Sequence, residues 1–132
     1  MKAFVVKDPK KFDPVSIQKL LKQSYWAEDR SLEAIERSIQ NSLVYGIFER
    51  ENLVAFGRVV TDYATMYWIC DIIVDKDYRG NAYGKRIVEA IDQTTCLTGL
   101  KGILVTKDAH SLYEKIGFRS IPDNLMMKAS DN

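Results

Sequence analysis

The sequence is poor in the residues that build metal sites and disulfide frameworks. Its 132 residues include one histidine, His110, and two cysteines, Cys70 and Cys96, which lie far apart without a Cys-x-x-Cys spacing. Structural zinc sites and small disulfide-rich scaffolds need several such residues at close, regular spacings. The sequence therefore predicts neither a metal site nor a disulfide-stabilised fold.

An excess of charge of one sign is also missing. The 19 Lys and Arg residues nearly balance the 18 Asp and Glu residues, which leaves a formal net charge of +1. Non-specific nucleic-acid binding needs a strong basic excess on one face, so no nucleic-acid partner is predicted. No apolar run is long enough to span a bilayer, and the N-terminal residues lack the apolar core of a signal peptide. We therefore expect a cytoplasmic protein without a membrane partner.

The organisation of the chain points to one domain over residues 1–132. We find no linker, internal repeat or low-complexity stretch, and 46% of the residues are hydrophobic, enough for a real core. The predicted elements, in order, are a strand at 2–6, helices that start at Asp13-Pro14 and after Ser31, strands at 43–50, 53–61 and 66–74, a helix at 81–94, a strand at 102–105, a helix at 108–115 and a strand at 125–128. This alternation predicts a mixed α/β sheet with helices on both faces.

The most informative segment follows the strand at 66–74. A short polar loop leads into a helix whose first turn holds Gly80 and Gly84, with Arg79 and Lys85 beside them. Such a turn offers unpaired backbone N–H groups and the positive end of a helix dipole to a phosphate. The alternative is that the glycines only cap and pack a helix. A Walker A loop and a GxGxxG fingerprint both fail to match.

Two motifs together resemble one known family. Residues 78–85 resemble the acetyl-CoA-binding signature of the GCN5-related N-acetyltransferases (GNAT), Arg/Gln-x-x-Gly-x-Gly/Ala, with Arg79 first, Gly84 last and Ala82 where glycine is usual. Residues 109–118, Ala-His-Ser-Leu-Tyr-Glu-Lys-Ile-Gly-Phe, look like the family's A-x-x-L-Y-x-K-x-G-F segment. The likeness extends loosely from Ala3 to Met127. Thr106 stands where the family usually has asparagine.

The resemblance implies the GNAT fold, with a mostly antiparallel sheet, and transfer of an acetyl group from acetyl-CoA to an amine. It also implies that the strand around Ile73 pairs with the pantetheine amides and supplies an N–H to the developing oxyanion, while the following loop holds the pyrophosphate. The residues expected to bind acetyl-CoA are Ile72, Ile73, Val74, Arg79, Gly80, Asn81, Ala82, Tyr83, Gly84, Lys85 and Thr106.

Tyr113 and Asp71 are the expected catalytic residues. Tyr113 occupies the position at which the family often places a general acid for the CoA thiolate; the alternative is a purely packed ring. Asp71 is the one ionisable residue in an apolar strand. It could deprotonate the amine through water, hold an ammonium group, or be a structural carboxylate satisfied by its neighbours.

The acceptor side is expected between the first two helices and after the third strand. Tyr25, Trp26 and Asp62 are the candidate substrate-binding residues, with Asp29 and Arg30 close to the first two, since aromatic and acidic side chains suit a cationic amine. The predicted acceptor is a small-molecule amine. The alternatives are a protein lysine or N-terminus, and a CoA-binding module without turnover. The oligomeric state, monomer or homodimer, stays open.

Overall fold

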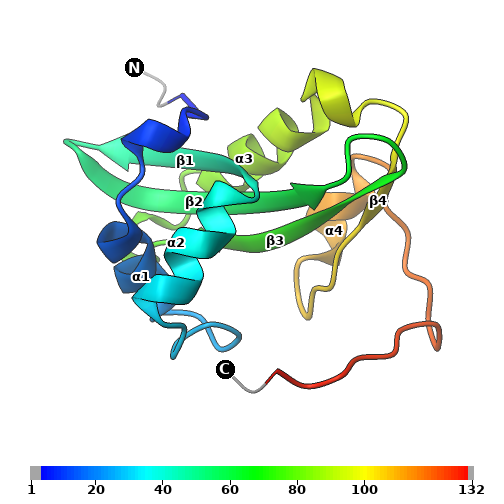
Figure 1. Ribbon diagram of the computed structural model, residues 1–132. Helices are drawn as coiled ribbons and strands as arrows, with labels where there is room; N and C mark the ends of the chain where they lie inside the picture. Colours follow the sequence, from blue (N-terminus) through cyan, green and yellow to red (C-terminus); the bar gives the residue numbers. More distant parts are fainter. Residues whose placement is uncertain (1–3, 131–132) are drawn as a thin grey trace.

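The computed structural model describes residues 4–130, which form a four-stranded sheet between two layers of helix (Figure 1). The strand order is β1-β2-β3-β4, with antiparallel pairing from β1 to β3 and parallel pairing of β3 with β4. The mixed, mostly antiparallel sheet predicted from the sequence is therefore confirmed. The strands are β1 (Leu43–Glu49), β2 (Asn52–Thr61), β3 (Met66–Val74) and β4 (Lys101–Ile103); the α-helices are α1 (Pro14–Leu21), α2 (Leu32–Gln40), α3 (Tyr83–Asp92) and α4 (His110–Glu114); the 3₁₀ helices are η1 (Pro9–Lys11), η2 (Lys76–Tyr78) and η3 (Thr95–Leu97).

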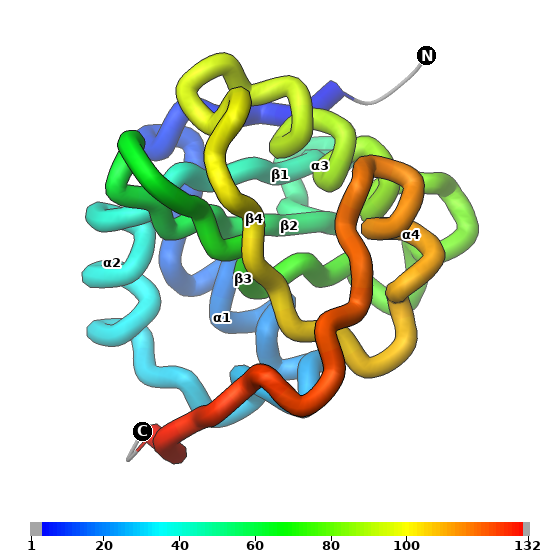
Figure 2. The backbone as a smooth tube through the Cα atoms, turned by 90° about the vertical axis from the view of Figure 1, so that its right-hand side faces the viewer, coloured from blue at the N-terminus to red at the C-terminus, as the bar shows by residue number. Residues whose placement is uncertain are grey.

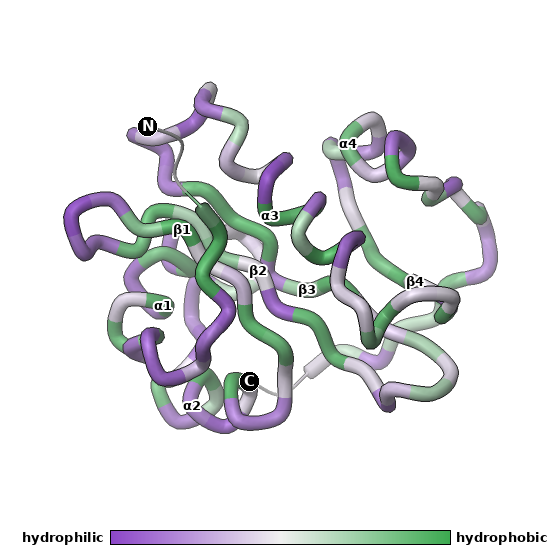
Figure 3. Tube along the Cα trace, turned by 90° about the horizontal axis from the view of Figure 1, so that it is seen from above, coloured by the Kyte–Doolittle hydropathy of each residue, from purple (hydrophilic) through white to green (hydrophobic). Residues whose placement is uncertain are grey.

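Each face of the sheet has its own hydrophobic core. Helices α1 and α2 cover one face, where Ile17 and Ile35 pack against Phe56 of β2. Helix α3 covers the other face, where Ile87 and Ile91 pack in one cluster with strand residues that include Val59. In Figure 3 the strands are mostly hydrophobic and the connecting loops mostly hydrophilic, as expected for a sheet that is buried on both sides.

The predicted helix starts are confirmed in detail. The Asp13 carboxylate accepts a hydrogen bond from the Val15 N–H, and Pro14 takes the first helical position of α1. The Ser31 hydroxyl accepts from the Ala34 N–H at the start of α2. Both caps satisfy N–H groups that the helix itself leaves free.

The connection between β1 and β2 lies one residue earlier than the sequence suggested. Arg50 and Glu51 form the turn, with φ values of 51° and 72°, and Asn52 already pairs with Glu49. A two-residue hairpin with the twist of its strands needs positive φ at both central residues. The prediction that Glu51 and Asn52 form the turn is therefore wrong, because the pairing of the strands extends to Asn52.

Two of the predicted strands are not confirmed. Met1–Ala3 lie outside the described residues, and what remains of the strand predicted at 2–6 is a single bridge between Val6 and Gly46. The strand predicted at 125–128 is wrong: these residues, all described, form no strand, and Met126 is 95% exposed. Figure 2 shows this C-terminal segment, in red, running below the sheet without lying alongside a strand.

The predicted bounds of β3, 66–74, are confirmed, whereas the ends of α3, β4 and α4 move by one or two residues. Helix α3 begins at Tyr83 rather than Asn81, because Ala82 is in the left-handed region. The strand predicted as buried at 102–105 is β4, at Lys101–Ile103, and it is half-exposed because it pairs along one edge only.

A β-bulge interrupts β3 at Asp71. Phe56 of β2 pairs with Ile73 and Arg58 pairs with Cys70, so β3 contains one extra residue here, and Asp71 has φ 56°. The extra residue shifts the alternation of side chains. Before the bulge Ile69 packs on the α3 side, whereas after it Ile73 packs on the α1/α2 side. The bulge therefore turns Asp71 toward α1 and α2.

Gly102 provides a test of the packing between β3 and β4. A Cβ at this position would lie 2.6 Å from Tyr67 Oη and 2.8 Å from Phe118 Cζ. Because both neighbours are rigid rings, we expect Gly102→Ala to lower the free energy of unfolding by about 1 to 3 kcal/mol, measured by urea denaturation.

The control for this prediction is Gly84→Ala, where the added Cβ would meet only Val74 Cγ2 at 3.6 Å, an ordinary contact. This variant should be as stable as the wild type or slightly more stable, since alanine favours a helix. Equal unfolding curves for the two variants would refute the packing argument.

Candidate functional site

The loop from β3 to α3 exposes a continuous row of backbone donors. None of the N–H groups from Arg79 to Lys85 donates a hydrogen bond to another residue of the described chain, and the first bonded N–H in this stretch is that of Arg86, to the Ala82 carbonyl. Helix α3 places the positive end of its dipole at the same point. Free donors around a helix N-terminus are what a phosphate group needs.

Backbone conformation explains the small residues in this loop. Gly80 has φ 90° and Ala82 has φ 63°, both in the left-handed region. Alanine there costs on the order of 1 kcal/mol, which accounts for the glycine that the motif usually has at this position. Gly84 is different, because its conformation is ordinary and nothing in the protein crowds it. The space above Gly84 is open, so a ligand can approach the backbone closely.

Two side chains brace this loop. Arg79 Nε donates to the Val74 carbonyl at 3.3 Å, and Asn81 Nδ2 donates to the Tyr78 carbonyl at 2.9 Å. Lys85 Nζ lies 3.9 Å from Glu89 Oε1 on the exposed side of α3. The positive charges of Arg79 and Lys85 thus flank the free N–H groups.

Strand β3 has an open edge beside this loop. Its parallel pairing with β4 ends at Trp68 and Ile103, so the part of β3 from Ile69 to Val74 has no strand on that side within residues 4–130. An unpaired strand edge offers alternating N–H and C=O groups to an extended ligand. Ile72, Ile73 and Val74 therefore lie in continuity with the Arg79–Lys85 loop.

Tyr113 and Thr106 both follow β4: Thr106 lies in the loop to α4 and Tyr113 in α4 itself. The Tyr113 ring packs against Phe118, with centroids 6.1 Å apart, and its hydroxyl has no hydrogen-bond partner among the described residues. Burial raises the pKa of Tyr113 to about 12, so the phenol is protonated at neutral pH. The Thr106 hydroxyl accepts from the Ala109 N–H and holds the start of α4.

Asp71 is held by three donors. Its Oδ2 accepts from Arg30 Nη1 at 2.7 Å and from Arg58 Nε at 2.9 Å, and its Oδ1 accepts from the indole N–H of Trp26 at 3.1 Å. Burial raises the pKa of Asp71, but the charges and hydrogen bonds of Arg58 and Arg30 outweigh that effect, so the pKa lies below the usual aspartate value. A carboxylate in this state is a weak base. This geometry favours the structural alternative.

The loop between α1 and α2 forms a solvent-open pocket of about 320 Å³ beside Asp71. Tyr25, Trp26 and Arg30 line it, and Ser130 closes it on the side of the C-terminal segment. Lys107, which follows β4, places its ammonium 4.3 Å from the centre of the Tyr25 ring. Residues from three distant parts of the chain therefore meet at this pocket.

The structure does not bring Asp62 to this pocket. Asp62 lies in the turn between β2 and β3, at the opposite end of β3 from Val74. The hydroxyl of Thr65 donates to its Oδ2, and the backbone N–H groups of Thr65 and Ala64 donate to its Oδ1; these bonds hold the pKa of Asp62 well below its usual value. Such a pattern is typical of a turn-forming aspartate.

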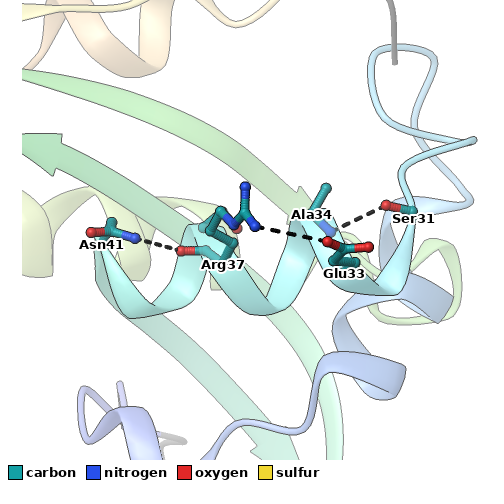
Figure 4. A pocket seen from close by; sticks show the side chains of 6 residues that line it. Ser31, Glu33, Ala34, Arg37 and Asn41 are labelled. Atoms are coloured by element: carbon teal, nitrogen blue, oxygen red, sulfur yellow. Dashed lines mark hydrogen bonds and ion pairs between the residues drawn. The ribbon is translucent and has the colours of Figure 1, made fainter.

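A larger hollow of about 490 Å³ lies along α2 and shares Ala34 with the smaller pocket, but Tyr25, Trp26 and Arg30 do not line it (Figure 4). Its polar groups already bond within the helix: Ser31 caps Ala34, Arg37 pairs with Glu33, and Asn41 donates to the Arg37 carbonyl. Because the expected substrate-binding residues Tyr25 and Trp26 line the smaller pocket and not this hollow, we place the site at the smaller pocket.

Two contributors to the site were not found from the sequence. Arg58 is the one charged residue between Leu53 and Thr61, and a lone charge in an apolar strand was a signal that could have paired it with Asp71. Lys107 carried no comparable signal, because its contact with Tyr25 depends on how two loops meet in space.

The described part of the chain shows neither a metal-binding cluster nor a membrane-spanning helix. No group of three His, Cys, Asp or Glu side chains in residues 4–130 could hold a metal ion. No helix of that part is long and apolar enough to cross a membrane.

Comparisons with known proteins agree with this geometry. A family model described as an acetyltransferase (GNAT) domain matches residues 40–120. The crystal structure of a protein from Xanthomonas campestris pv. campestris, ascribed to the GNAT acetyltransferases, is 34% identical; the match covers 98% of this chain and 94% of that one, with a TM-score of 0.90.

More distant matches are informative in other ways. An aminoglycoside 6′-N-acetyltransferase complexed with coenzyme A shares the fold, with 19% identity, a TM-score of 0.59, and coverage of 67% of this chain and 53% of that one. The Glycine max protein named histone acetyltransferase TAP1 is 27% identical over 79 residues, 58% of this chain and 34% of that protein. The match thus spans about a third of the length of the curated relatives.

The ion pairs of Asp71 provide a stability test. Asp71→Asn leaves two partly buried guanidinium groups without their counter-charge, so we expect a loss of about 3 kcal/mol at pH 7 in urea denaturation. Because the pKa of Asp71 is lowered by folding, its contribution is present above the unfolded value near 4 and is lost as the pH falls through the folded value. As the pH falls below about 4, the free energy of unfolding should therefore fall more for the wild type than for Asp71→Asn, and the difference between the two should shrink.

Glu33→Gln is the matched control, since it breaks an exposed pair with Arg37 at 3.8 Å. Its stability should change by less than about 0.5 kcal/mol. Equal losses in both variants would show that Asp71 is no better paired than a surface carboxylate.

Proposed function

Because the chain belongs to the GNAT family of acetyltransferases, we propose that it transfers the acetyl group of acetyl-CoA to the primary amine of a small molecule. The observation that carries this proposal is the row of free N–H groups from Arg79 to Lys85, next to the open edge of β3. A ligand with a diphosphate and an amide-bearing arm needs these two features side by side.

The residues present fit acetyl-CoA, which supplies the acetyl group as a reactive thioester. The backbone of Gly80, Ala82 and Gly84 holds the pyrophosphate, with Arg79 and Lys85 as counter-charges. Asn81 and Tyr83 belong to the same loop. The open edge at Ile72, Ile73 and Val74 pairs with the pantetheine amides, and Thr106, in the loop after β4, adds a polar contact to the same arm. Binding at the distant nucleotide then positions the thioester at the bulge.

At the bulge, the chain provides for charge and proton movement. A backbone N–H of β3 after Asp71 stabilises the negative charge that develops on the carbonyl oxygen, a contribution of about 3 kcal/mol. Tyr113 donates its phenolic proton to the departing thiolate. Burial keeps that proton on Tyr113 until it is needed, although a pKa of about 12 makes the phenol a weaker acid than in water.

Asp71 acts in this proposal by positioning rather than as the general base. Its carboxylate orients the Trp26 indole and the Arg30 guanidinium at the acceptor pocket. The amine therefore enters as the neutral form or loses its proton to water.

One observation favours a different acceptor. The soybean relative is named a histone acetyltransferase, which supports a protein lysine as the alternative. A CoA-binding module without turnover is supported by Ala82, since its strained conformation could weaken the loop. Location in the cytoplasm and a monomeric or homodimeric state stay predictions.

Calorimetric titration with acetyl-CoA is the first test. We expect selective binding, with a micromolar Kd, over ATP and NAD. Gly84→Glu places a negative charge at the pyrophosphate site, so its affinity should fall by about ten-fold or more. The same change should not unfold the protein, because acidic residues stabilise the first turn of a helix.

Gln93→Glu adds the same charge at the exposed opposite end of α3 and should leave the affinity unchanged. Acetyl-CoA binding that Gly84→Glu does not weaken would place the cofactor elsewhere. Absence of any binding would refute the proposed function.

Tyr113→Phe tests the general acid. The ring packing against Phe118 is kept, so acetyl-CoA affinity should stay within about two-fold, while kcat falls on the order of 100-fold. Because the pKa of Tyr113 is raised to about 12, the wild-type kcat/KM should rise with deprotonation of the amine and then stay level to about pH 10. A fall in rate near pH 9, or an unchanged kcat in the variant, would contradict this role.

A further inference from the structure

The charges around Asp71 do not balance. One carboxylate pairs with two guanidinium groups, those of Arg30 and Arg58, so the cluster keeps one positive charge. Arginine stays protonated at every physiological pH. The cluster is partly buried: the side chain of Asp71 is 4% exposed, that of Arg58 15% and that of Arg30 25%. A partly buried excess charge is a feature that a ligand of opposite charge can satisfy.

Arg30 keeps donors for such a ligand. A guanidinium group has five N–H donors, and Arg30 uses one nitrogen, Nη1, in its bond to Asp71. Its remaining nitrogens have no partner among the described residues, and no side-chain nitrogen or oxygen there is buried without one. The free donors of Arg30 therefore reach solvent at the pocket that Arg30 lines.

The Arg30 side chain is set in place by its own loop. The backbone carbonyl of Arg30 accepts a hydrogen bond from Gln18 Nε2 of α1 at 3.1 Å, and the backbone N–H of Arg30 donates to the Ala27 carbonyl. The Ser24 hydroxyl links the Leu21 carbonyl to the Ala27 N–H within the same loop. With Asp71 fixing the guanidinium, Arg30 is preorganised, so little order has to be created when a ligand binds.

Both signs of charge meet at this pocket. Glu28 and Asp29 are exposed on its rim, and neither lies within ion-pair distance of a cation in the described chain. The ammonium of Lys107 lies 4.3 Å from the centre of the ring of Tyr25, which also lines the pocket. A pocket with a fixed guanidinium and free carboxylates matches a zwitterion better than a polycation, because a polycation would be repelled by Arg30, Arg58 and Lys107.

From these contacts, and resting on the proposed function, we infer that the acceptor is an amine that also carries a carboxylate, as a free amino acid does. Arg30 binds the carboxylate through its free N–H donors, with the excess charge of the cluster behind it. The planar fork of arginine matches a carboxylate, and a single positive charge matches its single negative charge. Glu28 and Asp29 attract the ammonium end before it loses its proton.

The test measures thiol release from acetyl-CoA with the common amino acids, their carboxamides, spermidine and phosphoethanolamine. We expect at least one amino acid to exceed its own carboxamide about ten-fold or more in kcat/KM, since the amide lacks the charge that Arg30 binds. Arg30→Gln should bring that ratio close to one, and Arg30→Lys should restore part of it. The core pair of Asp71 with Arg58 remains in both variants.

The control is Arg37→Gln, which removes an exposed arginine of α2 and should leave the ratio unchanged. Preference for spermidine, for phosphoethanolamine or for the carboxamides would overturn the inference. So would a ratio that survives Arg30→Gln, or the absence of turnover with every amino acid in a protein that binds acetyl-CoA. Failure to bind acetyl-CoA at all would instead refute the proposed function.

Discussion

The extra residue in β3 is the constraint on which both halves of the site depend. Because Asp71 and Ile72 together face one position of β2, the alternation of side chains between the two faces of the sheet is reversed after Asp71. Asp71 then points to α1 and α2, where two arginines and an indole bond to it, while Ile72 and Val74 beyond it pack on the α3 side. Without the bulge, regular alternation would carry the carboxylate and the residues after it to the wrong faces.

The bulge also explains why one position carries a charge inside an apolar strand. A buried carboxylate is costly unless it is paired, and the arginines that pair it come from β2 and from the loop before α2. The ion pairs therefore attach the α1–α2 loop to the sheet at the point where chemistry is proposed. The same ion pairs therefore stabilise the fold and orient the residues of the acceptor pocket.

Much of the fold could be predicted from the sequence because its signals are local. The caps at Asp13 and Ser31, the run of β-branched residues in β3 and the motif from Arg79 to Gly84 each fix a structure over a few residues. The strand at 125–128 failed because strand formation needs a partner edge, which a short apolar run cannot supply. The partners of Asp71 were not predictable for the same reason, since Arg30 and Arg58 lie 41 and 13 residues away in the sequence. Asp62 has the charge expected of a contact to a cationic amine, but its carboxylate accepts hydrogen bonds from the backbone of its own turn.

The α1–α2 loop and the C-terminal segment that leads to Ser130 meet at the acceptor pocket and differ in how they are held. The α1–α2 loop is tied by side-chain hydrogen bonds and ion pairs, whereas residues 119–129 make no backbone hydrogen bond to the rest of the described chain. Substitutions in such a segment disturb few interactions, so they cost little stability. In evolutionary terms, the α1–α2 side of the pocket resists change, whereas the segment that leads to Ser130 tolerates it. Descendants of this chain can thus vary the position of that segment beside the pocket while the acyl-donor side stays as it is.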